Sequence, residues 1–172
     1  MSSRINCLRG LGLVLATAAL APGLRAEVKR GDRFPSLAAA DLGGGPLPDT
    51  AGKIVLVDFW ASWCAPCKAS FPAYARIQND YAARGVVIIA VSVDEQAADF
   101  AAFVHKWAPP FATVRDQSQK LVSRVDVPTM PTSYLLDRTG KVRFLHVGYY
   151  GAETEKTIRT ELDRLLAEGH SP

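Results

Sequence analysis

Two cysteines three residues apart, Cys64 and Cys67, are the residues of this 172-residue chain whose spacing most directly indicates chemistry. Residues three apart on a helix share a face, so the two sulfurs can reach bonding distance in a small ring. Cys64 lies where an apolar run gives way to a helical pattern, and the unpaired N–H groups at a helix start favour a thiolate there. Pro66 suits the first helical turn, where its missing N–H costs nothing. The pair therefore predicts a disulfide-exchange site, with Cys64 attacking and the more buried Cys67 resolving.

A C-x-x-C pair can also be half of a zinc site or a structural disulfide. A zinc site needs about four ligands, and the chain adds only Cys7 and three scattered histidines, His105, His146 and His170. A ring this small constrains the unfolded chain least among disulfides, so it would stabilise the fold weakly. We therefore expect a redox pair, with no metal and no cofactor.

The first 26 residues differ in composition from the rest of the chain. A basic start (Arg4, Arg9) precedes an apolar run at 10–21, and small residues follow up to Ala26. This order is typical of a secretory signal peptide, whose apolar core is too short to span a bilayer comfortably. We expect cleavage after Ala26, an extracytoplasmic or periplasmic location and one mature domain at 27–172. A retained membrane anchor stays open as an alternative.

Removing this segment changes the cysteine count and the charge. Cys7 leaves with it, so Cys64 and Cys67 become the only thiols. The segment carries three arginines and no acidic residue, so the formal net charge of +3 falls to zero. A neutral protein without a basic cluster gives no support for nucleic-acid binding or electrostatic membrane docking.

The elements that must position the cysteines alternate between strands and helices. Apolar, β-branched runs predict buried strands, and apolar residues at helical spacing predict helices. A turn at 43–46 predicts a small N-terminal hairpin, and a turn at 137–140 predicts a second hairpin. The predicted strands are 54–59, 86–93, 111–114, 133–136 and 142–147, and the predicted helices are 67–83, 97–107, 118–125 and 153–167. Such an order indicates an α/β three-layer sandwich.

The stretch VDFWASWCAPCK at 57–68, with Pro72 five residues after the second cysteine, strongly resembles the thioredoxin superfamily. The longer N-terminal segment and the export signal make the chain similar to the TlpA/ResA-type extracytoplasmic thioredoxins, which are associated with cytochrome c and cytochrome oxidase assembly. The similarity runs over about 31–166. It implies the thioredoxin fold, a three-layer α/β/α sandwich with a central mixed sheet. To that fold the chain would add an N-terminal β-hairpin and an insertion between the second core strand and the cis-proline strand.

The resemblance also assigns roles to residues outside the cysteine pair. Asp58 matches the buried acid that assists proton transfer at the resolving cysteine. A carboxyl inside an apolar run should have a raised pKa, which suits acid–base work near neutrality, although a solvated strand-end acid stays open. Met130, Pro131 and Thr132 match the cis-proline loop, whose backbone would pair with an extended client segment. Pro128 is a competing candidate for the cis position.

Three residues around Cys64 are expected to meet the client protein. Trp63 matches the tryptophan before the first cysteine, and Ala65 and Pro66 fill the two positions between the cysteines. Some ResA-like proteins carry an acidic residue there, and this chain does not. Trp60 is expected in the core, and the pair at 149–150 is expected to pack in a loop.

The function implied is a protein-disulfide reductase of the cell envelope, acting as a monomer. Plausible clients are the haem-site cysteines of apocytochrome c or copper-delivery proteins, and a membrane thiol transporter would supply electrons. Three alternatives stay open: a dithiol oxidase of the same fold, a metal-binding or copper-relay module, and a peroxidase of a related fold. A peroxidase would place its reactive cysteine in a Pro- and Thr-bearing loop, which the sequence does not show.

Overall fold

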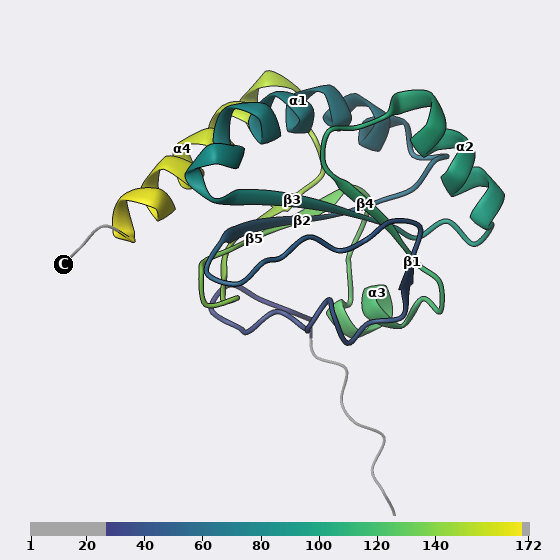
Figure 1. Cartoon of the computed structure of the whole chain (residues 1–172), viewed down its shortest axis with the longest axis horizontal. Helices are drawn as coiled ribbons and strands as arrows, with labels where there is room; N and C mark the ends of the chain where they lie inside the picture. Colours follow the sequence, from purple (N-terminus) through teal and green to yellow (C-terminus); the bar gives the residue numbers. More distant parts are fainter. Residues whose placement is uncertain (1–26, 170–172) are drawn as a thin grey trace, which may run out of the picture.

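The computed structural model describes residues 27–169, and Figure 1 shows their arrangement. The predicted signal peptide at 1–26, with Cys7 and the predicted cleavage point after Ala26, lies outside the described residues, as does His170. Within the described range, no helix is long and apolar enough to cross a membrane.

A mixed six-stranded sheet forms the centre of the molecule, in the order β1-β4-β3-β2-β5-β6. β2, β3 and β4 run parallel, whereas β5, β6 and β1 are antiparallel to their neighbours. The strands are β1 Leu42–Gly43, β2 Ile54–Trp60, β3 Val86–Ser92, β4 Ala112–Asp116, β5 Thr132–Leu136 and β6 Val142–Val147. β2 lies inside the sheet and is buried along its whole length, because helices or loops cover both of its faces.

The helices divide between the two faces of the sheet (Figure 1). They are α1 Ala65–Tyr81, followed by the short 3-10 turn η1 Ala82–Arg84, α2 Ala97–Trp107, α3 Lys120–Val125 and α4 Ala152–Glu168. The buried side chains of α1, α2 and α4 belong to one core cluster, and those of α3 and the N-terminal segment belong to the other. This three-layer arrangement confirms the predicted thioredoxin fold, and α2, β4 and α3 occupy the stretch between β3 and β5.

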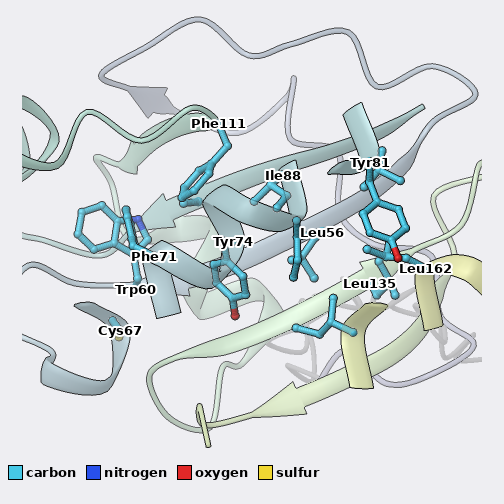
Figure 2. Close-up of a cluster of buried hydrophobic side chains, with 14 of the residues drawn as sticks. Leu56, Trp60, Cys67, Phe71, Tyr74, Tyr81, Ile88, Phe111, Leu135 and Leu162 are labelled. Atoms are coloured by element: carbon cyan, nitrogen blue, oxygen red, sulfur yellow. The ribbon is translucent and has the colours of Figure 1, made fainter. Parts of the chain in front are cut away.

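The alternation of side chains along β2 explains both clusters. Leu56 and Trp60 point to the face covered by α1, whereas Val57 and Phe59 point to the opposite face. Trp60 is fully buried, as predicted, and its ring lies 4.8 Å from that of Phe71 in α1 (Figure 2). The face that carries Trp60 also receives Cys67.

The N-terminal extension exists, but the predicted hairpin does not form. Within residues 27–53 its one strand, β1, pairs antiparallel with β4 and not with a neighbouring stretch of its own segment. Gly44, at φ +103°, lies so close to the Phe100 ring that a Cβ there would meet it at 2.5 Å. The glycine turn therefore fits the chain against α2, while β1 covers the outer edge of β4.

An ion-pair network joins the two long helices of the cysteine-bearing face. Glu155 in the first turn of α4 accepts hydrogen bonds from Arg76 of α1 and from Arg159, and Arg159 also pairs with Asp80 at 2.8 Å. The Arg76 hydrogen bond lowers the pKa of Glu155. The stabilisation is therefore present above the ordinary glutamate pKa and is lost as the pH falls through the depressed one.

We expect Glu155→Gln to cost about 1 kcal/mol of unfolding free energy at pH 7, the usual size of a partly exposed ion-pair network. The difference from the parent should shrink towards pH 3. Urea denaturation at both pH values measures this. Glu153→Gln is the matched control, because Glu153 is an exposed acid in the same helical turn and shares the helix-dipole contribution. Equal losses in the two variants would contradict the network's role.

Candidate active site

Cys64 and Cys67 form a disulfide at the start of α1, with their Cα atoms 5.3 Å apart. Cys64 is the N-cap residue of α1, and its Sγ accepts a hydrogen bond from the N–H of Cys67 at 3.2 Å. Because this N–H already points at Sγ, it would stabilise a thiolate at Cys64 once the disulfide is reduced. Pro66 lies in the first turn of the helix, as its fixed φ favours.

The two cysteines differ in exposure, although less than the sequence suggests. Cys64 is 5% exposed and Cys67 is completely buried. The residues around them provide the accessible surface: Trp63 is 70% exposed, and Ala65 and Pro66 are exposed as well. The accessible surface next to the disulfide therefore lies on the Cys64 side.

Asp58 lies inside the sheet on β2, in register with Ala90 of β3 and Ser133 of β5. Its side chain is completely buried, which excludes a solvated strand-end acid. Its position between Leu56 and Trp60 on β2 directs it to the face that also holds Cys67. Burial raises the pKa of the Asp58 carboxyl to about 7, and hydrogen bonds only partly offset that effect.

Two hydroxyl groups hold one oxygen of this carboxyl. Ser133 Oγ donates to Asp58 Oδ1 at 2.7 Å and Tyr74 Oη donates to it at 3.2 Å, while the two hydroxyl oxygens lie 2.7 Å apart. Asp58 Oδ2 is buried and has no hydrogen-bond partner among the described residues. One oxygen is thus fixed, and the other is available to a proton.

Sequence reasoning missed Tyr74 and Ser133 as members of the site. Tyr74 lies seven residues after Cys67, on the same face of α1 (Figure 2), and Ser70 between them donates to the Cys67 carbonyl oxygen at 2.8 Å. That i, i+7 spacing was the available signal, but it equally suits a core tyrosine. Ser133 can be placed next to Asp58 only when the pairing register of β2 and β5 is known.

The Met130–Pro131 peptide bond is cis. The loop lies at the same end of the sheet as the cysteines, because Thr132 pairs with Phe59 near the end of β2 and Met130 packs against the cluster that holds both cysteines. The Pro131 carbonyl oxygen accepts a hydrogen bond from Gly148 N–H at 2.8 Å. Thr132 is completely buried and its hydroxyl donates to the Thr129 carbonyl, so its side chain faces the loop.

Other candidate residues take ordinary positions. Tyr149 packs on Tyr74 with ring centroids 6.4 Å apart, as predicted, whereas Tyr150 is 75% exposed and lies over Gly148. His146 forms a 2.7 Å contact with Glu161 between β6 and α4. Across residues 27–169, no group of three or more His, Cys, Asp or Glu side chains could hold a metal ion.

A disulfide that caps α1, at the same end of this mixed sheet as a cis-proline loop, is the arrangement of a thioredoxin-fold thiol–disulfide oxidoreductase. The chain belongs to the AhpC/TSA family, whose model matches residues 30–145. It is 34% identical over 118 residues to the thiol-disulfide oxidoreductase ResA of Bacillus thuringiensis (strain Al Hakam), covering 67% of this chain and 68% of that protein. It is 29% identical over 143 residues to ResA of Geobacillus thermodenitrificans, covering 82% and 80%.

A solved structure agrees with these sequence relatives. The crystal structure assigned to the thiol:disulfide interchange protein DsbE from Chlorobium tepidum superposes with a TM-score of 0.73 at 32% identity. The alignment covers 81% of this chain and 99% of that one. Relatives and structure thus support the same exchange chemistry.

Proposed function

We propose that this protein reduces disulfides in client proteins outside the cytoplasm. The observation that carries the proposal is the asymmetry of the pair: Cys64 caps α1 at the accessible side, and Cys67 is buried on the face that receives Asp58. One cysteine is therefore suited to attack a client, and the other to release it.

The proposed reaction has two exchange steps. The Cys64 thiolate attacks one sulfur of a client disulfide, that S–S bond breaks, and the second client sulfur leaves as a thiolate. The Cys67 thiol then gives its proton to Asp58 and its sulfur attacks Cys64 Sγ, which releases the other client thiolate. Two electrons pass to the client, and the protein ends with the Cys64–Cys67 disulfide seen here. A dithiol donor must then reduce that disulfide again.

Trp63, Ala65 and Pro66 would contact the client, and the backbone beside Pro131, from Met130 to Thr132, would pair with it. Resemblance to the TlpA/ResA group supports apocytochrome c or copper-protein cysteines as clients, a membrane thiol transporter as electron donor, and export of a monomer by residues 1–26.

The direction of electron flow is tested by the reduction potential, measured by equilibration with glutathione. A reductase should lie near the thioredoxin value of about −270 mV, whereas a value near the DsbA value of about −120 mV would identify an oxidase. Stoichiometric metal retained by the reduced protein would instead favour a copper-relay module.

A Tyr74→Phe variant tests the link between the hydroxyl pair and Asp58. Removing a hydrogen bond to the carboxylate should raise the pKa of Asp58 above about 7, since that bond lowers it in the parent. We expect the second exchange step to slow about threefold at pH 7 and to recover by pH 9, once Asp58 is again ionised. The measurement is the rate of that step from pH 5 to 9.

Tyr81→Phe is the matched control for this variant. Tyr81 lies on the same helix, and its hydroxyl binds Asp163 and the Arg159 carbonyl at the far end from the cysteines. In Tyr81→Phe, the rate of the second exchange step should depend on pH as it does in the parent protein. Identical profiles for Tyr74→Phe and the parent would contradict the link.

A further inference from the structure

Asp94 lies two residues after the end of β3 and is buried, with 2% of its surface exposed. The proposed exchange mechanism does not use its carboxyl group. Both of its oxygens accept hydrogen bonds. Oδ1 accepts from the N–H of Ser62 at 3.0 Å and from its hydroxyl at 2.8 Å. Oδ2 accepts from the same N–H at 3.1 Å and from the hydroxyl of Ser92 at 2.7 Å.

Ser62 lies in the loop that joins β2 to α1, two residues before Cys64. Inside this loop, the N–H of Cys64 donates to the Ala61 carbonyl oxygen at 3.1 Å. The loop also presents Trp63, which is 70% exposed. Asp94 therefore binds both the backbone N–H and the hydroxyl of Ser62, in the segment that carries the attacking Cys64 and the exposed Trp63.

Asp94 is itself fixed by its neighbours. Its N–H donates to Ser92 Oγ at 2.9 Å, and Nη1 of Arg115 in β4 donates to the carbonyl oxygens of Asp94 and Glu95 at 3.3 and 3.2 Å. The N–H of Val93 adds a 2.9 Å bond to the Trp60 carbonyl oxygen. The hydrogen bonds of Asp94 thus connect the loop between β2 and α1 to the ends of β3 and β4. Rigid support of this kind keeps a reactive group in productive geometry.

We propose that Asp94 is a positioning residue for disulfide exchange. It holds loop 61–64 through Ser62, so that Cys64 stays in its capping position on α1 and Trp63 faces the client. The inference rests on the proposed function, and it adds a residue that never touches the reacting sulfurs.

Asp94→Asn keeps the size of the side chain but turns one of its two acceptors into a donor facing hydroxyl and N–H groups. In the full chain, with insulin as the disulfide substrate and dithiothreitol as the reductant, we expect kcat/KM to fall about tenfold. Ser62→Ala removes only the hydroxyl contact, so it should have a smaller effect in the same direction. It also serves as the milder variant should Asp94→Asn fold poorly.

Asp116→Asn is the matched control. Asp116 is also a buried acid at the end of a strand, but its Oδ2 accepts from the N–H of Val122 in α3, on the opposite face. Its unfolding free energy should fall comparably in urea, while kcat/KM stays within about twofold of the parent. Equal activity losses in Asp94→Asn and Asp116→Asn would overturn the proposal, because loss of stability alone would then explain both.

A double variant and a client-free assay complete the test. If Asp94 acts through Ser62, the double variant Asp94→Asn with Ser62→Ala should have the same kcat/KM as Asp94→Asn alone. A kcat/KM of the double variant reduced by the product of the two single-variant factors would overturn the inference.

Alkylation of reduced Cys64 by iodoacetamide needs no client, and it should slow in both single variants. Faster alkylation in Asp94→Asn would also overturn it. A parent that reduces no insulin refutes the proposed function, whereas an active parent matched by Asp94→Asn refutes only this inference.

Discussion

A Cys67→Ser variant should halt the reaction at the mixed disulfide and leave a client protein covalently attached to Cys64. The buried Cys67 is the only other cysteine among the described residues, so no second sulfur there can release the client. Turnover should fall by at least about a thousandfold, since the two-step route loses its second nucleophile. Non-reducing electrophoresis and mass spectrometry of the adduct measure the trapped species.

Cys64→Ser is the matched control, because it removes the other sulfur of the same disulfide. It should be equally inactive but should trap no client, since Cys67 is fully buried. Comparable trapping by both variants would mean that the roles of the two cysteines are not distinct. Undiminished turnover by Cys67→Ser would contradict two-step exchange.

Asp58→Asn should slow the second exchange step about a hundredfold at pH 8, the lower end of what a positioned general base contributes. Asparagine keeps the shape and can accept from Ser133 and Tyr74, but it cannot take a proton from Cys67. A chromogenic aromatic disulfide makes both steps visible by stopped flow. The first step should be unchanged, and Asp116→Asn should leave both steps unchanged.

Although Asp58→Asn should slow the reaction, it should raise the stability of the folded protein at high pH. The pKa of Asp58 is raised to about 7 in the folded protein, so folding opposes its ionisation. At low pH Asp58 is neutral in both the folded and the unfolded protein, so its burial costs no ionisation. As the pH rises from the pKa of Asp58 in the unfolded chain, 3.8, to its value of about 7 in the folded protein, the unfolding free energy falls. Asp58→Asn removes this loss, although its buried amide lacks a partner for its second donor. We therefore expect a net gain of about 1–2 kcal/mol at pH 8 and none at pH 5.

Urea denaturation of the oxidised protein at the two pH values measures this gain. An inactive but more stable variant is the pattern expected when a buried acid is kept for function and not for folding. If Asp58→Asn were equally destabilised at both pH values, Asp58 would be a structural residue.

The sequence was sufficient to predict the position of the cysteine pair, because local signals determine it. A continuous apolar run predicts β2, and the C-x-x-C motif with Pro66 and a helical pattern predicts the start of α1. Burial of Asp58 followed from the same run, since a strand covered on both faces has no exposed position. These features depend on neighbours in the chain.

Features that depend on distant pairing could not be predicted. The glycine turn at 43–46 suits a local hairpin as well as it suits β1 pairing with β4, and only the packed structure decides between them. Ser133 contacts Asp58 because of the β2–β5 register, and Asp94 reaches Ser62 across 32 positions of sequence. Single serines and aspartates carry no signal of such contacts, because these residue types are equally common in turns.

The most direct test of the central claim is the pH dependence of iodoacetamide alkylation of each cysteine in the reduced protein, followed by mass spectrometry. Cys64 at the start of α1 should react with an apparent pKa clearly below the value of about 8.5 for a free thiol. Cys67 should stay unmodified while the protein is folded. A Cys64 pKa at or above that value, or equal reaction at both cysteines, would contradict an attacking and a resolving thiol.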